Sequence, residues 1–104
     1  MMGDAQSVRE TARAHVAQGE HEEAIPLLRQ WLESCPNDPE ACALLGAAHF
    51  ELQQWRNALD AAQVVVRLRP NSARDWCNLG VVLRKAGCLP EARNAQRKAL
   101  YIDP

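Results

Sequence analysis

Histidine and cysteine side chains are the groups in this sequence that could carry out acid–base, nucleophilic or metal chemistry. His15 and His49 are separated by the same number of positions as Leu45 and Leu79, so both could stand at the same point of two repeated units and share a metal ion or a proton. A metal site needs several clustered ligands, and each unit would supply only one histidine at the recurring position. We therefore expect both imidazoles to occupy packing positions, and we predict no metal site.

The four cysteines, Cys35, Cys42, Cys77 and Cys88, form no Cys-x-x-Cys pair. A disulfide framework is typical of small, secreted, loop-rich chains, whereas helical periodicity can supply the core of this one. The pattern therefore favours free thiols and a cytoplasmic location. Cys42 and Cys77 are expected to be buried on neighbouring helices, where thiols pack as small apolar groups.

No catalytic motif stands in the sequence, which has no phosphate-binding glycine loop, no His-Glu-x-x-His and no Gly-x-Ser-x-Gly. We therefore predict a protein that is not an enzyme and uses no cofactor. A hydrophobic content of 47% with 24% charged residues indicates a folded chain. No stretch approaches the ~20 apolar residues that cross a bilayer, so no membrane partner is predicted.

The sequence repeats itself at a fixed interval, which is the number of positions from Leu45-Gly46 to Leu79-Gly80. We call this number the repeat interval, and two further sets of residues recur with the same spacing. Apolar residues recur at helical spacing on both sides of Gly87, which predicts a helix, a tight turn and a second helix. The two recurring sets are Ala24, Ala58 and Ala92, and Pro36, Pro70 and Pro104.

This pattern resembles the tetratricopeptide repeat, a unit of about 34 residues whose signature is Trp-x2-Leu-Gly-x2-Tyr followed by Ala-x3-Phe and Pro. The second repeat has Cys42 for the tryptophan and His49 for the tyrosine. The first repeat, with Thr11-Ala12 in place of Leu-Gly, departs furthest. The third repeat matches at Trp76, Leu79, Gly80, Ala92 and Pro104.

The resemblance implies an all-α fold, an α-solenoid of three helix-turn-helix repeats wound as a right-handed superhelix. The expected units are an N-terminal tail over residues 1–4 and repeats over 5–38, 39–72 and 73–104. Such arrays need polar caps for solubility, and nothing polar follows the last helix, so we expect either a fragment of a longer array or pairing with another molecule. The residues expected to be partly open to water are Ala92, Ala95, Ala99 and Ile102.

Local signals predict where the helices begin and end. Asp38 can cap a helix over 39–52, with Pro39 at its first position. Ser72 or Asn71 can cap the first helix of the third repeat. That helix is predicted over residues 73–86, and the others over residues 5–18, 55–68 and 89–102. A further helix is predicted between Gly19 and Cys35, with an apolar face formed by Ala24, Ile25, Leu28, Trp31 and Leu32.

Glycine and proline mark the turns of the predicted hairpins. Gln53-Gln54 stands at a turn without glycine, so we expect that turn to be less tight or more strained than its neighbours. Gly80 lies inside a helix, where glycine costs about 1 kcal/mol against alanine, and we expect another helix to cross closely there. Pro26 is expected in the first turn of its helix.

The resemblance also implies a function, because the first helices of tetratricopeptide repeats line a concave groove that commonly binds extended peptides. Helical spacing independently places Arg74, Val81 and Arg84 on one side of a helix. Arginine forks bind carboxylates bidentately, so we expect cations at both ends, an apolar middle and an acidic peptide partner. The candidate groove residues are Arg9, Arg13, Leu44, Ala47, Phe50, Arg74, Asn78, Val81 and Arg84.

Some family members clamp the acidic C-terminal tails of chaperones with a lysine, two asparagines, a lysine and an arginine. The two asparagines are absent here, and an asparagine replaces the last basic residue. The sequence therefore argues against that clamp and favours a different acidic or acidic-apolar peptide. At those five places the chain has Arg9, Arg13, Leu44, Arg74 and Asn78.

Other interpretations stay open. The same charges could form an ordinary solvated surface. Residues 5–38 carry three more acidic than basic side chains, and residues 73–104 three more basic than acidic, so copies could stack head to tail as a homo-oligomer through the last helix. The chain could also be an accessory domain of a larger enzyme. Nucleic acid is not expected, because the basic third repeat lacks interleaved aromatic residues.

Overall fold

The computed structural model of the protein describes residues 5–104 and is all-α over that range, as predicted. The tail predicted over residues 1–4 lies outside the described residues. Six helices follow one another along the chain: α1 (Ala5–Ala17), α2 (His21–Ser34), α3 (Pro39–Glu51), α4 (Trp55–Leu68), α5 (Ala73–Lys85) and α6 (Leu89–Ile102).

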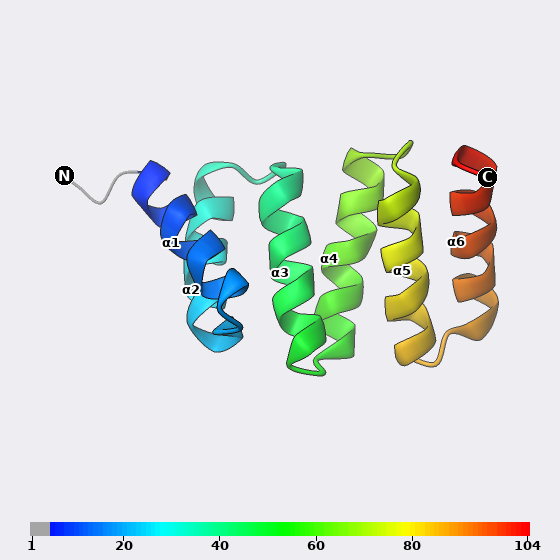
Figure 1. Ribbon diagram of the computed structural model, residues 1–104, viewed down its shortest axis with the longest axis horizontal. Coiled ribbons are helices and arrows are strands. Elements are labelled where there is room, and N and C mark those ends of the chain that lie inside the picture. Colours follow the sequence, from blue (N-terminus) through cyan, green and yellow to red (C-terminus); the bar gives the residue numbers. More distant parts are fainter. Residues whose placement is uncertain (1–4) are drawn as a thin grey trace.

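The helices form three hairpins that stand side by side in a row (Figure 1). Packing is closest within the pairs α1–α2, α3–α4 and α5–α6, and successive pairs meet through α2–α3 and α4–α5. The described chain measures 47 × 25 × 20 Å, so it is elongated along the row. Each hairpin therefore covers part of its neighbour, which is how such repeats build a continuous core.

Side-chain caps begin two of the helices where the sequence predicts them. Asp38 Oδ1 accepts hydrogen bonds from the backbone N–H groups of Glu40 at 2.9 Å and Ala41 at 3.4 Å, and Pro39 follows at the first helical position. Ser72 Oγ accepts from the backbone N–H of Asp75 at 3.2 Å. These bonds satisfy donors that have no partner inside the helix.

Glycine inside the third hairpin marks a close helix crossing, as predicted. A Cβ added at Gly80 would lie 3.1 Å from Gln96 Cγ and 3.4 Å from the carbonyl oxygen of Ala92, both on α6. In the second hairpin, a Cβ at Gly46 would lie 3.2 Å from Ala61 Cβ on α4. Both positions bring the backbone of one helix against the surface of the next.

Two clusters of buried side chains, one at each end of the row, stabilise the stack. The first comprises Ala12, Ala24, Leu28, Trp31 and Ala41 and joins the first hairpin to α3. The second comprises Val66, Leu79, Leu83, Ala92 and Ala95 and joins α4 to the third hairpin.

The prediction that the last helix leaves its alanines partly open to water is wrong. Ala92, Ala95 and Ala99 are at most 4% exposed, and the first two pack in the second cluster with side chains of α5. Ile102 is half-buried. The apolar residues of α6 divide between two faces, and the exposed large ones are Leu89, Leu100 and Tyr101.

Two smaller expectations are also corrected. Pro26 is the sixth residue of α2 and lies inside the helix, not in its first turn. Proline has no N–H to continue the helical ladder, but this ring is exposed, so water can reach the carbonyl left without a donor. Cys77 is exposed and not buried, whereas Cys42 is buried as predicted, and all four cysteines are free.

The three turns inside the hairpins share a left-handed residue. Gly19 and Gly87 have φ of 77° and 87° at their turns, and Gln53 has φ of 61° at the equivalent place. A residue with a Cβ is disfavoured in this region, whereas glycine adopts it freely. The turn without glycine is therefore the strained one, as predicted.

We expect Gln53→Gly to stabilise the protein by about 1 kcal/mol, because it removes the Cβ from the left-handed position. The reverse change at the matching turn, Gly87→Gln, should destabilise it by a similar amount. Urea unfolding of the two variants and the parent measures both effects. A destabilised Gln53→Gly variant would show that another contact of Gln53 outweighs the backbone strain.

Candidate functional site

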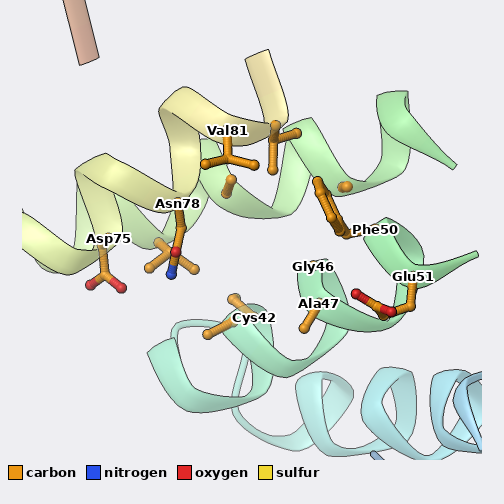
Figure 2. A pocket seen from close by; sticks show the side chains of 13 residues that line it. Cys42, Gly46, Ala47, Phe50, Glu51, Asp75, Asn78 and Val81 are labelled. Carbon is orange, nitrogen blue, oxygen red and sulfur yellow. The ribbon is translucent and has the colours of Figure 1, made fainter. Parts of the chain in front are cut away.

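A cavity of about 240 Å³ opens between α3 and α5 (Figure 2). Its walls carry Ala47, Phe50 and Val81, and its floor is formed by small residues of α4 and by Gly46. We call this cavity the α3–α5 groove. The residues of α4 that line it are Ala58, Ala62 and Val65.

Polar groups stand at the ends of the α3–α5 groove. Glu51 lies near Phe50 at one end, and Asp75 and Asn78 lie at the other (Figure 2). Asp75 is 6% exposed and pairs with Arg69, whose Nη2 donates to Oδ1 at 3.2 Å and whose Nε lies 2.9 Å from Oδ2. The Asp75 carboxylate is therefore already balanced, and Asn78 remains exposed as a neutral hydrogen-bonding group.

The structure brings four of the predicted groove residues together. Ala47, Phe50, Asn78 and Val81 line the same cavity. Leu44 instead packs against the first buried cluster. Arg74 and Arg84 lie exposed on α5, the helix that supplies one wall.

Arg9 and Arg13, the other two predicted groove residues, lie around Trp31 near the junction of the first and second hairpins. Their guanidinium carbons are 5.4 and 5.0 Å from the centre of the Trp31 ring. Arg9 Nη2 also donates to Cys35 Sγ at 3.1 Å. These contacts pair the cations with the electron-rich face of a buried indole.

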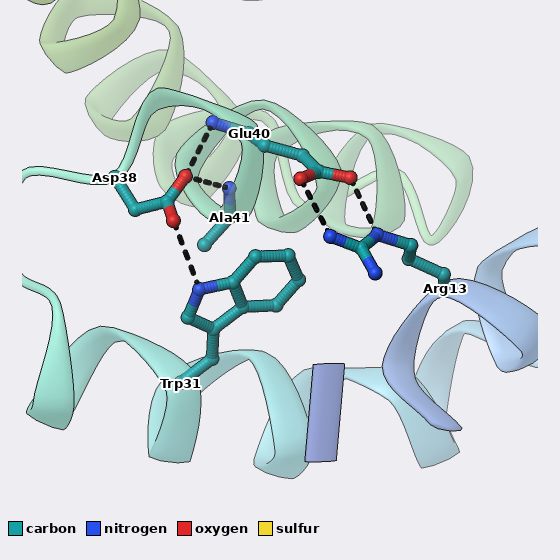
Figure 3. Close-up of polar contacts among 5 residues, drawn as sticks. All are labelled: Arg13, Trp31, Asp38, Glu40 and Ala41. Atoms are coloured by element: carbon teal, nitrogen blue, oxygen red, sulfur yellow. Dashed lines mark hydrogen bonds and ion pairs between the residues drawn. The ribbon is translucent and has the colours of Figure 1, made fainter. Parts of the chain in front are cut away.

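A network of polar contacts fixes this junction (Figure 3). Arg13 donates to both carboxylate oxygens of Glu40, from Nε at 2.7 Å and from Nη2 at 2.9 Å. Trp31 Nε1 donates to Asp38 Oδ2 at 3.1 Å, while the other oxygen of Asp38 caps α3. Arg13 therefore already has a bidentate carboxylate partner within the chain, which any acidic ligand would have to displace.

Glu40 and Cys42 have shifted pKa values. The hydrogen bond from Arg13 lowers the pKa of the Glu40 carboxyl below its ordinary value, against a smaller opposing effect of burial. Burial raises the pKa of the Cys42 thiol, and the charge of Asp38 adds to that rise. The Cys42 thiol therefore stays protonated at neutral pH and is a poor nucleophile.

His15 and His49 each close the turn of their own hairpin. His15 Nδ1 lies 2.8 Å from Glu20 Oε1, and His49 Nδ1 lies 2.6 Å from Gln54 Oε1. Glu20 and Gln54 stand at the N-caps of α2 and α4 without forming side-chain caps there. Within residues 5–104, the structure holds no group of three or more histidine, cysteine or acidic side chains placed to bind a metal ion.

Sequence reasoning did not identify the floor of the α3–α5 groove. The residues of α4 that form it, Ala58, Ala62 and Val65, recur four and three positions apart and share one face of that helix. This spacing is visible in the sequence and could have indicated the floor. The cavity itself could not, because it depends on the distance between α3 and α5.

Three stacked hairpins with a groove between the first helices of neighbouring hairpins define a helical-repeat protein. Family models described as tetratricopeptide repeat match residues 5–48 and residues 44–104. The chain belongs to the tetratricopeptide repeat family, whose domains generally mediate protein–protein interactions and are typically non-catalytic.

Solved structures of MamA share this fold. "MamA MSR-1" superimposes with a TM-score of 0.90 and 23% identity, over 96% of this chain and 57% of that one. "MamA 41-end from Desulfovibrio magneticus RS-1" gives 0.89 and 20% identity, over 94% of this chain and 55% of that one. The chain thus spans little more than half the length of these structures, and the likeness shows the fold alone.

Over the described residues 5–104, no helix combines the length and the apolar character that crossing a membrane requires.

We expect Glu40→Gln to lower stability at pH 7 and to have little effect near pH 3. Because the pKa of Glu40 is lowered in the folded state, the ion pair stabilises the fold above the ordinary glutamate pKa and is lost as the pH falls through the folded-state pKa. The effect should be small, since both side chains are nearly half exposed. Urea midpoints at pH 7, 5 and 3 measure it.

The matched control is Glu33→Gln, which removes the same charge from an exposed position of α2. Among residues 5–104, Glu33 has no ion-pair partner within 4.0 Å. Its stability difference from the parent should change little over the same pH range. Equal pH dependence in the two variants would rule out a specific role for the Arg13–Glu40 pair.

Proposed function

We propose that the chain is a non-catalytic scaffold that binds an extended acidic-apolar peptide segment along the α3–α5 groove. The observation that supports this most is the apolar cavity bordered by a helix with unpaired arginines. Arg74 and Arg84 are exposed, and neither has an ion-pair partner among residues 5–104. An apolar side chain would enter the cavity, and carboxylates beside it would meet the arginine forks.

The charges around the groove indicate where the carboxylates and the apolar side chain of the proposed peptide would lie. Arg74, Asn78, Val81 and Arg84 follow one face of α5, so they would contact successive parts of an extended segment. Glu51 would repel an acidic residue at its own end of the cavity. We therefore place the carboxylates of the peptide along α5 and its apolar side chain between Phe50 and Val81.

The amino-terminal arginines contribute less to this proposal than the sequence suggested. Arg13 is held by Glu40 at 2.7 Å and lies over Trp31. A carboxylate of the ligand would have to displace Glu40 there, so acidic ligands should favour the arginines of α5. The four free cysteines are compatible with a reducing cytoplasm, where we propose the protein acts.

Replacing both α5 arginines tests the groove. We expect Arg74→Ala/Arg84→Ala to bind a fluorescein-labelled 12-residue peptide of alternating glutamate and leucine at least tenfold more weakly than the parent, because two charge-assisted contacts are lost. Fluorescence anisotropy at 50 and 200 mM salt measures the affinity. Ala47→Trp, which fills the cavity from an exposed position, should also weaken binding.

The matched control is Arg93→Ala/Arg97→Ala, which removes the same charge from exposed positions of α6. Its affinity should stay within about twofold of the parent, allowing for the screened long-range field. Equal losses in the two double variants would reduce the interaction to a general attraction between charges and contradict a specific groove.

We propose head-to-tail self-association as a second function, favoured by the exposed face of α6. Leu100 is 62% exposed, whereas Val66, which lies one repeat interval earlier, is 7% exposed and packs in a cluster with α5. The outer face of α6 thus carries an apolar residue where the preceding hairpin is covered by the next one. The acidic first hairpin of a second copy would complement the basic α6.

Leu100→Ser/Tyr101→Ser should abolish this self-association. We expect the parent to form concentration-dependent oligomers, because apolar burial and opposite charges both contribute. These oligomers should weaken as salt rises, because salt screens the attraction between the charges. Sedimentation velocity from low to high micromolar concentrations measures the distribution. A parent that stays monomeric throughout would contradict this second function and leave the groove proposal unaffected.

A further inference from the structure

A second cavity, of about 410 Å³, is separate from the α3–α5 groove and touches it only through the shared residue Cys42. We call it the α2–α4 cleft, because α2 and α4 supply its two sides and α3 lies between them. Most of its lining is apolar. The lining residues used below are Leu32, Pro36, Cys42, Leu45, Ala61 and Val64.

The third hairpin shows what fills this place when the repeat is complete. Moving one repeat interval along the chain takes Cys42 to Trp76 and Pro36 to Pro70. Trp76 Nε1 donates a hydrogen bond to the carbonyl oxygen of Pro70 at 2.8 Å. The ring of Trp76 packs against the second buried cluster.

Four further lining residues of the cleft have counterparts around Trp76. Leu32, Leu45 and Ala61 are the counterparts of three members of the second buried cluster, and Val64 is the counterpart of Lys98. Lys98 Nζ lies 5.9 Å from the centre of the Trp76 ring. The α2–α4 cleft is therefore the site that holds an indole in the third hairpin, with a cysteine in place of the tryptophan. The three cluster members are Val66, Leu79 and Ala95.

We propose that the α2–α4 cleft binds the indole ring of a tryptophan side chain from a partner protein. The Pro36 carbonyl corresponds to the acceptor used by Trp76, and no group among residues 5–104 donates a hydrogen bond to it. An inserted indole would bury its apolar body against Leu32, Leu45 and Ala61 and give its N–H to that oxygen. Tryptophan suits such a half-open site because it combines a large apolar surface with one donor.

The lining of the cleft includes one acidic side chain, Asp60, and one basic side chain that suits an aromatic ring. Arg29 lines the cleft from α2 and is exposed. It forms no ion pair within 4.0 Å in the described part of the chain. A guanidinium beside the cleft is attracted to the face of a bound indole, as Lys98 is placed over Trp76. The cleft thus offers a partner for each part of an indole: the Pro36 carbonyl for its N–H, the apolar lining for its body and Arg29 for its electron-rich face.

The three tryptophans of this sequence are already engaged, so the occupant has to come from outside residues 1–104. Trp31 is 3% exposed within the first cluster. Trp55 contacts Phe50 with ring centres 5.2 Å apart, and Trp76 fills its own site. The proposal does not depend on the α3–α5 groove and can hold if that groove binds nothing.

Titration of the full chain with small indole probes tests the cleft. We expect N-acetyl-tryptophanamide to shift the backbone amide NMR signals of Leu45, Ala61 and Val64 with a Kd on the order of 1 mM. Signals of Ala47 and Val81 in the α3–α5 groove should not move. The 1-methylindole analogue, which cannot donate to Pro36, should bind about fivefold more weakly. No saturable shift, or shifts confined to the groove, would overturn the proposal.

Peptide probes distinguish a partner protein from a free metabolite. A nine-residue peptide with a central tryptophan should bind at least tenfold more tightly than free indole, because flanking residues can contact the rim. Its leucine counterpart should bind more weakly than the tryptophan peptide. Free indole binding as tightly as the peptide would make the ligand a small molecule and overturn the assignment to a protein side chain.

Three variants test the cleft by substitution. Cys42→Trp should fill the cleft with its own indole and abolish binding of every probe, whereas Cys77→Trp, at an exposed position of α5, should leave binding unchanged. If Cys42→Trp does not fold, Val64→Lys decides: it restores the cation found over Trp76 and should tighten binding about threefold. Unchanged affinity in Val64→Lys would overturn the equivalence of the two sites.

A second copy is the competing occupant, through its exposed Tyr101. That would appear as concentration-dependent shifts of the cleft signals without any probe, lost in Tyr101→Ser. This result would replace the partner tryptophan by self-association and overturn the proposal as stated.

Discussion

Close contact between the two helices of a hairpin is the constraint on which the rest of the structure depends. At Gly46 and Gly80 an added Cβ would lie only 3.2 and 3.1 Å from the nearest atom of the partner helix, which is closer than ordinary van der Waals contact. Hairpins joined this closely are thin, and each leaves an apolar face for its neighbour to cover. The row of hairpins follows from that need, and the α3–α5 groove lies where two first helices meet side by side with α4 beneath them.

The same residue type serves two purposes in this row. Arg13 forms a bidentate pair with Glu40 and lies over Trp31, so its charge stabilises the junction between the first two hairpins. Arg74 and Arg84 belong to the third repeat and have no such partners among residues 5–104. Whether an arginine of a first helix can bind a ligand therefore depends on whether the neighbouring repeat supplies a carboxylate that pairs with it. The number of arginines on these helices alone does not predict how many can bind a ligand.

Much of the fold could be predicted because its signals are local or periodic. Asp38 and Ser72 cap helices by bonds to residues two or three positions away, and the repeat interval fixes the order of the hairpins. The pairing of Arg13 with Glu40 could not be predicted, since it spans 27 residues and depends on how two hairpins meet. Ala92 and Ala95 were misassigned for a related reason: both faces of a second helix are apolar, and the sequence pattern does not say which one faces α5.

Positions at which one repeat differs from the others indicate what the protein binds, which the fold shared by all repeats does not. Trp76 shows that the frame of the repeat accommodates an indole, with a proline carbonyl as its acceptor and a cation over its ring. At the equivalent position Cys42 the indole ring is absent, and the cavity found there is lined by the counterparts of the residues that surround Trp76. Shape alone would make this cavity one surface hollow among several. Comparison with the filled site of the same chain adds the chemistry of the missing group, because the two sites are built by equivalent helices of successive repeats at the same register.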